Sequence, residues 1–288
     1  MPTTQSLKLI QVGRRKPDLT QPEYFDYHFR NHGAISAAVI EGYDRPQKYT
    51  QTHHPVSVFY PRPNASIPNA NQPWSGRDDT TELYFRDEAH LVSNFASNYT
   101  RNVVGPDALN FADVETAISL VARESLAWRR GGTGGNGTAD GQEGEGDEGN
   151  EEAGRDVALF FIASANGTAD GAGLEKDLTP LLVKQLQQEA GDVATGLVVN
   201  VGFDLKSFDP VSYFGGLRLH ALVYKVVMDG EGLGAVAKVR AAQKGFFAAA
   251  GGRIRLGDSF AVFGKEGTVL DLGRGVEFDA ERQPKVYC

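Results

Sequence analysis

Residues 129–155 divide the chain in two and constrain its fold more than any other segment. This segment contains no large apolar residue and consists mostly of glycine and acidic residues. Such a composition buries too little apolar surface to offset the entropy of ordering the backbone, so we expect a flexible linker. The sequence therefore predicts one unit over residues 1–128, a linker over 129–155 and a second unit over 156–288.

The two parts show the same order of predicted elements. In the first part, short β-compatible segments alternate with longer helical ones: strands at 7–14, 47–54, 80–86 and 115–122, and helices at about 22–41 and 88–104. In the second part the strands are 157–164, 195–201, 218–228 and a last one made of 260–264 and 269–272, with helices at 173–190 and 233–250. A bulge or turn is expected at 264–267, and the Pro- and Asn-rich residues 55–77 are expected to form a long loop. Each part thus reads β-α-β-β-α-β, the order of a ferredoxin-like unit, although the two share little residue identity.

Charge and composition exclude several classes of function. Seven acidic residues and no Lys or Arg lie within 131–154, and subtracting those seven negative charges from the net charge of −8 leaves −1. The predicted folded parts therefore have no excess of basic residues for binding nucleic acid. No apolar run is long enough to span a membrane, and the N-terminus lacks the apolar core of a signal peptide. The single cysteine is the final residue, which excludes a disulfide within the chain, so we expect a cytoplasmic protein.

The first predicted helix carries the main candidates for chemistry. Thr20 is placed as its N-cap, with Glu23 at the capping-box spacing, and the helix is expected to close at Gly42. His28 and His32 are four residues apart and therefore lie on one face of this helix. Histidine titrates near neutral pH, which suits proton transfer. The alternative is that these rings pack in the core and bond to backbone carbonyls.

Three blocks of residues resemble an EthD domain. The first runs from Lys16 to Ala34 and contains Lys16-Pro17-Asp18-Leu19-Thr20, Glu23-Tyr24-Phe25, His28-Phe29 and Asn31-His32-Gly33-Ala34. The second is Lys48-Tyr49-Thr50-Gln51-Thr52-His53, and the third is Pro106-Asp107 with Asn110-Phe111. Together they cover most of residues 6–125. Ala34 replaces the proline usual in the family after His-Gly, and the second half resembles the family by element order alone.

The resemblance implies an α+β fold from the dimeric α/β-barrel superfamily. A single ferredoxin-like sheet leaves one face uncovered, and members of this superfamily cover it by pairing two sheets. Two units in one chain would form the same barrel internally, as a pseudo-dimer, and further association into a homodimer is left open. A pocket is then expected between sheet and helices or inside the barrel. The long insertion and the linker suggest a eukaryotic, fungal source.

The resemblance and the alternation of strand residues together select the candidate site. His32, at the family's histidine position, is the preferred catalytic residue, with His28 and Tyr49 as further catalytic candidates. The predicted substrate-binding residues are Gln51, His53, Glu82, Tyr84 and Phe29. Tyr49, Gln51 and His53 alternate onto one strand face, and Glu82 and Tyr84 share a face of the next strand. The alternatives are a polar sheet edge and an exposed glutamate.

The second half offers few reactive side chains. His220 and Tyr224 are expected on one strand face, where a core role for His220 is favoured. A metal set of His28, His32 and Glu82 is supported only by helical spacing, and a haem-binding histidine has no support in the sequence. No nucleotide-binding glycine motif, P-loop, nucleophile elbow or Cys nucleophile is present, so no cofactor and no metal are expected.

These observations favour a cofactor-independent acid–base enzyme. By resemblance, its substrate is a small hydrophobic aromatic or polyketide-like molecule, and the reaction is of the decarboxylase, dehydratase or cyclase type. The alternatives are a non-catalytic binding protein for a hydrophobic metabolite and a cofactor-free oxygenase. A third alternative is a second half that only stabilises the first.

Overall fold

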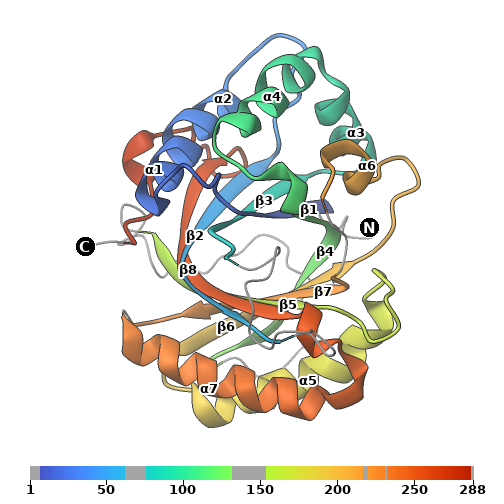
Figure 1. The fold of residues 1–288 in the computed structure, drawn as a ribbon, viewed down its shortest axis with the longest axis vertical. Coiled ribbons are helices and arrows are strands. Elements are labelled where there is room, and N and C mark those ends of the chain that lie inside the picture. The colour runs from blue at the N-terminus through green and yellow to red at the C-terminus, as the bar shows by residue number, and fades with distance from the viewer. Residues whose placement is uncertain (1–6, 62–75, 132–153, 217–219, 231, 287–288) are drawn as a thin grey trace.

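The structure is a computed structural model that describes residues 7–61, 76–131, 154–216, 220–230 and 232–286. Within these ranges, eight strands form a closed barrel in which every neighbouring pair is antiparallel (Figure 1). The strands are β1 (Leu7–Gly13), β2 (Lys48–Phe59), β3 (Asp79–Phe85), β4 (Ile118–Arg129), β5 (Arg155–Ile162), β6 (Ala194–Gly202), β7 (Leu222–Met228) and β8 (Phe260–Asp271). Their order around the barrel is β1-β3-β2-β8-β5-β7-β6-β4.

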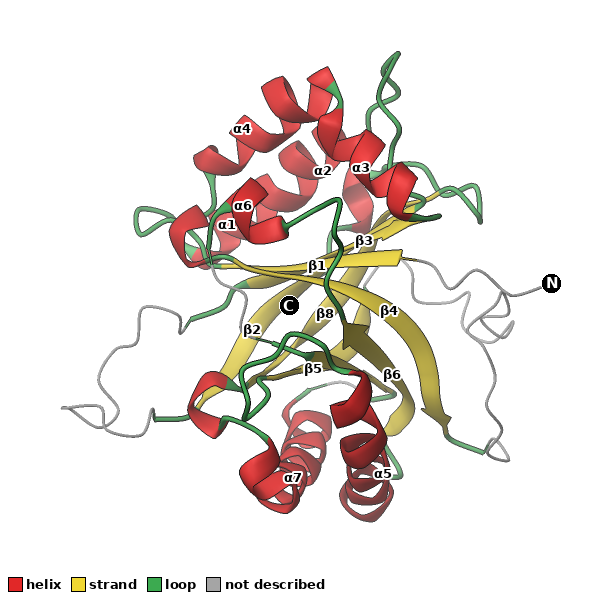
Figure 2. Cartoon of the chain, turned by 90° about the vertical axis from the view of Figure 1, so that its right-hand side faces the viewer, coloured by secondary structure: helices red, strands yellow, loops and turns green. Residues whose placement is uncertain are grey.

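Helices cover the barrel on two opposite sides (Figure 2). One side holds α1 (Gln21–Asp26), a π-helix (Tyr27–His32), α2 (Gly33–Ala37), α3 (Glu88–Ala96), a second π-helix (Thr100–Val104), α4 (Gly105–Asp107) and α6 (Pro210–Phe214). The other side holds α5 (Ala172–Glu189) and α7 (Leu233–Ala250), which pack against each other. Short 3₁₀ turns follow at Ala108–Asn110, Val114–Thr116, Gly251–Arg253, Leu256–Asp258 and Ala280–Arg282.

The element order expected in each half is present, and the α+β barrel is confirmed. Two seams, β2 with β8 and β4 with β6, join the halves into one sheet. The assignment of each half to a separate ferredoxin-like unit stays a prediction, as do the boundaries at 128 and 156. Of the expected linker, residues 132–153 lie outside the described residues.

The first helical segment is shorter and less regular than predicted. Thr20 is its N-cap, and both hydrogen bonds of the capping box with Glu23 form, as expected. The segment ends at Ala37 rather than Glu41, because Ala38 is extended with ψ of 140°. The prediction that Gly42 closes the helix was therefore wrong. The π-helix in the middle of the segment carries both His28 and His32.

Pairing with neighbouring strands lengthens several strands beyond their predicted ends. β2 continues to Phe59 through the start of the expected loop, and β4 and β5 include Arg129 and Arg155 from the ends of the expected linker. β8 continues through residues 264–267, where a bulge or turn was predicted. No turn forms there, but the pairing of β8 with β2 shifts register between Phe263 and Lys265. The glycines of β8 are held in extended conformation by pairing with β2 and β5, which are distant in the sequence. The rest of the expected loop, residues 62–75, lies outside the described residues.

The inside of the barrel is apolar at one end and charged at the other. The apolar cluster draws only on strands, with Ile10, Leu120, Leu159, Val223 and Val262 among its members. Alternate residues of the same strands face the helices: Phe160 and Tyr224 lie under α5 and α7, and Leu9 packs with α3 residues.

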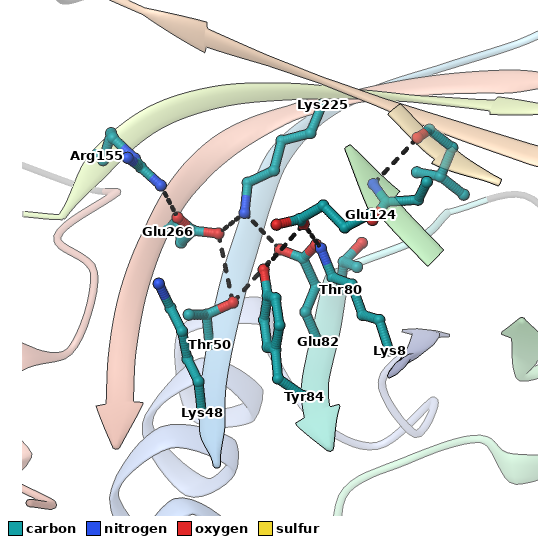
Figure 3. A network of polar contacts seen from close by, with 12 residues as sticks. Lys8, Lys48, Thr50, Thr80, Glu82, Tyr84, Glu124, Arg155, Lys225 and Glu266 are labelled. Carbon is teal, nitrogen blue, oxygen red and sulfur yellow. Dashed lines mark hydrogen bonds and ion pairs between the residues drawn. The ribbon is translucent and has the colours of Figure 1, made fainter. Parts of the chain in front are cut away.

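Charged side chains from six strands meet at the charged end (Figure 3). Lys225 contacts Glu266 and lies 2.6 Å from Glu82, whose other oxygen is 2.5 Å from Lys8. Lys8 also pairs with Glu124 at 2.5 Å, and Arg155 pairs with Glu266 at 2.6 Å. Three cations thus balance three anions in this group.

The buried charges hold one another in the ionised state. Burial alone would lower the pKa of Lys225, but the carboxylates of Glu266 and Glu82 raise it. Burial likewise opposes ionisation of Glu266, yet Lys225 and Arg155 bring its pKa well below the ordinary value. Lys225 belongs to the second half and Glu82 to the first, so this network links the two halves by ion pairs inside the barrel.

Replacing Lys225 by alanine is predicted to destabilise the fold strongly. Glu266 would lose its buried cation, and removing one partner of a buried pair costs about 3–5 kcal/mol. We expect a corresponding fall in the free energy of unfolding, measured by urea denaturation near neutral pH. Lys238→Ala is the matched control, because Lys238 pairs with Asp192 at the surface and its loss should change little. Equal effects of the two substitutions would contradict the role of Lys225.

Candidate active site

The best candidate site lies between the helices of the first half and the outer face of β1, β2 and β3. His28 and His32 project from the π-helix toward this sheet, and Tyr49, Gln51 and His53 alternate onto the same side of β2. All five were selected from the sequence, and the structure brings them together. Phe29 joins them as an apolar neighbour, with its ring centroid 6.3 Å from that of His53.

Glu82 and Tyr84, in contrast, do not belong to this group. Both face the inside of the barrel, where Glu82 joins the ion network and the Tyr84 hydroxyl donates to Glu124 at 3.2 Å. Their shared face was predicted correctly, but it is the face opposite the histidines. A metal set of His28, His32 and Glu82 therefore cannot form in this arrangement.

His32 forms a dyad with Asp107. Its Nδ1 lies 2.8 Å from one carboxylate oxygen of Asp107, and the other oxygen accepts hydrogen bonds from Tyr27 and Asn110 at 2.9 and 3.0 Å. Burial opposes ionisation of Asp107, but these hydrogen bonds lower its pKa below the usual value. An ionised Asp107 accepts a hydrogen bond from Nδ1–H, which leaves Nε2 of a neutral His32 as the basic nitrogen.

His32 is also the most exposed histidine. Its side chain is 14% exposed, whereas that of His28 is 4% exposed and those of the remaining four are buried. Within the described part of the chain, no hydrogen bond occupies Nε2 of His32. Its basic nitrogen is therefore the histidine nitrogen most available to an incoming molecule.

His28 is more deeply buried than His32. Its ring stacks on Phe111, with centroids 4.8 Å apart, and lies 5.6 Å from the His32 ring. Nδ1 faces Asp79 Oδ2 at 3.3 Å without the geometry of a hydrogen bond, and Nε2 lies 3.5 Å from the Tyr49 hydroxyl and 3.4 Å from that of Thr81. Burial, together with His32 and His53, holds the pKa of His28 well below its usual value, so the ring is neutral.

A chain of polar groups continues from His28 along β2. Gln51 donates to the Tyr49 hydroxyl at 2.6 Å, and its amide oxygen lies 3.4 Å from His53 Nε2. Burial raises the pKa of Tyr49 and lowers that of His53 to about 3. Both groups are therefore neutral at ordinary pH and act as hydrogen-bond donors or acceptors rather than charges.

Asp79 and Tyr24 complete the site at its inner end, and sequence reasoning missed both. The Tyr24 hydroxyl donates to Asp79, and burial raises the pKa of Asp79 to about 7. Gly13 makes room for this pair, because a side chain there would meet both Asp79 and the Tyr24 hydroxyl. Asp107 and Phe111 lie in the third block that resembles an EthD domain, but the sequence predicted no role for either. Nothing in the local sequence around Asp79 marks it, since only the pairing of β3 with β1 and β2 brings it to the histidines.

A groove of about 380 Å³ adjoins the site. Pro22, Phe25 and Arg30 form one wall, and Pro284 and Val286 of the C-terminal segment belong to the other. The Phe25 ring also stacks on His53 with centroids 4.2 Å apart, so it separates the groove from the buried polar chain. The volume falls within the range of small-molecule sites.

The second half presents no comparable group among the described residues. His220 makes edge-to-face contacts with Phe161 and Phe260, which face the barrel interior, and its Nε2 bonds to the Asp258 carbonyl at 2.9 Å. Tyr224 instead lies under α5, where its hydroxyl is 3.0 Å from Thr179. The expectation that the two share a face was wrong. The described residues also contain no cluster of three or more His, Cys, Asp or Glu suited to a metal, and no helix among them is long and apolar enough to cross a membrane.

Comparison with known families identifies the first half. Residues 16–115 match the EthD domain, the range that contains both histidines and Asp107. This part of the chain is EthD-like. Comparison with curated protein sequences finds no significant match.

Solved structures resemble this chain over nearly its whole length. An anthrone oxidase-like protein superposes with a TM-score of 0.51 at 11% identity, covering 93% of this chain and 95% of its own. At this identity the likeness concerns the fold alone. A chlorite dismutase from Candidatus Nitrospira defluvii gives a TM-score of 0.36 at 9% identity, with 91% and 92% covered. Neither comparison bears on the fungal source expected from the sequence.

Replacing Asp79 by asparagine is predicted to change how stability depends on pH. The pKa of Asp79 is about 7 in the fold, above the ordinary value of 3.8, so the folded protein holds a proton that the unfolded chain releases. This group therefore makes the protein less stable as pH rises from about 4 to about 7. Asp79→Asn should lose that part of the slope and melt at a higher temperature than the wild type near pH 8. Asp107→Asn is the control of opposite sign, because the pKa of Asp107 is lowered and its contribution is lost only in acid. A wild-type slope retained in Asp79→Asn would contradict this assignment.

Proposed function

We propose that this protein is an enzyme that uses His32 as a general acid–base on a small hydrophobic, aromatic or polyketide-like substrate. The observation that carries the proposal is the His32–Asp107 dyad, which combines a 2.8 Å contact, a partly exposed ring and an unoccupied Nε2. In this dyad Asp107 fixes the tautomer and orientation of the imidazole. Such positioned bases typically contribute about 10²–10⁴-fold to rate.

The proposed reaction is a proton transfer at carbon or oxygen next to an aromatic or enolisable group. Nε2 of His32 takes a proton from the substrate and returns it later, as required for a decarboxylation, dehydration or cyclisation. The negative charge that develops on the substrate oxygen is stabilised by a hydrogen bond from Tyr49, the phenol next to His28. Tyr84, the other tyrosine proposed from the sequence, faces the barrel interior and is not part of this step.

The hydrophobic nature of the substrate is supported by the surroundings of the histidines. Phe111 contacts both imidazole rings, and Phe25 and Phe29 flank His53. Beyond the Phe25 ring, the adjoining groove offers further apolar surface, and its Arg30 is paired with Asp26 at 3.1 Å. A flat ring bearing an ionisable oxygen matches this combination of aromatic walls and a single base.

The first experiment is native mass spectrometry of the purified protein, followed by organic extraction of any bound molecule and turnover assays on it and its hydroxylated aromatic analogues. We predict that His32→Ala lowers kcat by about 10²–10⁴-fold with little change in ligand affinity. Asp107→Asn should lower kcat as well, since the asparagine no longer requires the Nδ1–H tautomer.

Asn31→Ala provides a matched control, because Asn31 neighbours His32 but is exposed. It should retain wild-type turnover. Turnover unaffected by His32→Ala would exclude the acid–base role. Tight binding without any turnover by the wild type would favour the alternative of a binding protein for a hydrophobic metabolite.

A cofactor-free oxygenase is the second candidate, favoured by the structural likeness to an anthrone oxidase-like protein. The same base would then deprotonate a phenolic substrate, and the resulting carbanion would react with O₂. Oxygen consumption, followed with an electrode during turnover, separates the candidates: a lyase consumes none. His32→Ala should abolish consumption if the oxygenase proposal holds.

The two halves are proposed to serve this one site as a pseudo-dimer of two ferredoxin-like units. The repeated β-α-β-β-α-β order and the two seams of the barrel support that description. The second half supplies the opposite barrel wall and the C-terminal segment beside the groove. Cytoplasmic location and function without a cofactor belong to the same proposal.

A further inference from the structure

The deepest part of the candidate site contains an unexplained imidazole nitrogen. Nδ1 of His28 is fully buried and has no hydrogen-bond partner in the described part of the chain. The nearest polar atom is Asp79 Oδ2 at 3.3 Å. Leaving a buried polar atom unpaired costs about 1–3 kcal/mol. Such an atom is therefore expected to form a hydrogen bond in at least one protonation state of its neighbours.

The other contacts of His28 allow two tautomers. Nε2 faces the hydroxyls of Tyr49 and Thr81, each of which can either donate or accept a hydrogen bond. The stacked Phe111 ring holds the plane of the imidazole, so that Nδ1 faces Asp79 and Nε2 faces the two hydroxyls in the observed orientation. The choice between tautomers therefore depends on whether Asp79 offers a proton to Nδ1 or accepts one from it.

We propose that the carboxyl group of Asp79 sets the tautomer of His28 and, through it, the direction of the hydrogen bond between His28 and Tyr49. When Asp79 is protonated, its hydroxyl donates to Nδ1, and Nε2–H donates to the Tyr49 oxygen. When Asp79 is ionised, Nδ1–H donates to the carboxylate, and the Tyr49 hydroxyl donates to Nε2. In passing from the first state to the second, the carboxyl proton moves to Nδ1 and the Nε2 proton leaves to solvent, so one proton is released.

The groups around Asp79 place this switch near neutral pH. Burial raises its pKa to about 7, with a further contribution from the neighbouring Asp78, while hydrogen bonds from Tyr24, Thr81 and the Gly13 amide work in the opposite direction. The titratable and charged groups that act on or face Asp79 come from α1, the π-helix, β2 and the start of β3: Tyr24, His28, Tyr49, Arg77 and Asp78. Asp78 is itself bonded by Arg15 and Gln21.

The consequence for chemistry rests on the proposed function. Only the protonated state leaves the Tyr49 hydroxyl hydrogen free to donate to a substrate oxygen, because in the ionised state it is held by His28. Asp79 is thus a positioning residue that acts through His28 on Tyr49. Stabilisation of an enolate or phenolate by Tyr49 should weaken as pH rises through about 7.

The test is ¹⁵N NMR of histidine-labelled protein without substrate, with His28 assigned from a His28→Gln spectrum. We expect the wild type to change from Nε2–H to Nδ1–H as pH rises across neutrality. In Asp79→Asn, the amide can donate to Nδ1 at any pH, so His28 should keep the Nε2–H tautomer throughout. A wild-type His28 with one tautomer across this range, or an Asp79→Asn protein that still switches, would overturn the proposal.

Two further variants test whether the tautomer switch depends on Asp79. Tyr24→Phe removes a hydrogen bond that favours the ionised carboxylate, so the midpoint of the switch should move to higher pH, and an unchanged midpoint would contradict the proposal. Asp107→Asn acts on His32 alone and should leave the His28 switch in place. Because the NMR readout needs no substrate, a failed switch is distinguishable from a failed acid–base function, which would appear only in the turnover of His32→Ala.

Discussion

Closure of the barrel at its two seams is the constraint on which the rest of the structure depends. Each seam pairs a strand of one half with a strand of the other, so neither half completes a sheet without its partner. Closure also creates an interior that must be filled, with apolar side chains over most of its length and balanced charges at one end. The buried ion network is costly to form, but once the barrel is closed each of its charges has a counter-charge within reach.

The register between β2 and β3 sets the geometry of the candidate site. Gln51 pairs with Thr81 and His53 with Asp79, and this places the hydroxyl, amide and carboxyl groups of two strands side by side beneath the π-helix. That helix contributes both histidines within one turn. A single helical segment therefore packs against the paired strands β2 and β3. A shift of one residue in this register would send the polar groups into the barrel and bring Glu82 and Tyr84 out.

Much of this arrangement could be predicted from local sequence. The order of elements, the capping box at Thr20, the common face of Tyr49, Gln51 and His53, and the matched range of the EthD domain all follow from short-range pattern. What could not be predicted depends on pairing between distant strands: the unbroken β8, the far end of β2, and the opposite orientation of Glu82 and Tyr84. Asp79 shows the limit most clearly, since its importance comes from the Gly13 backbone and the Tyr24 hydroxyl, which are over fifty residues away.

The position of the seams also determines what counts as a domain in this protein. The EthD match covers residues 16–115, which leaves out both β1 (Leu7–Gly13) and β4 (Ile118–Arg129). A fragment cut at those boundaries would lack two strands and would expose the β2 edge that normally pairs with β8. Exposed edges of this kind template pairing with other chains. The edges of the matched range are covered only in the closed barrel, to which both halves of the chain contribute strands.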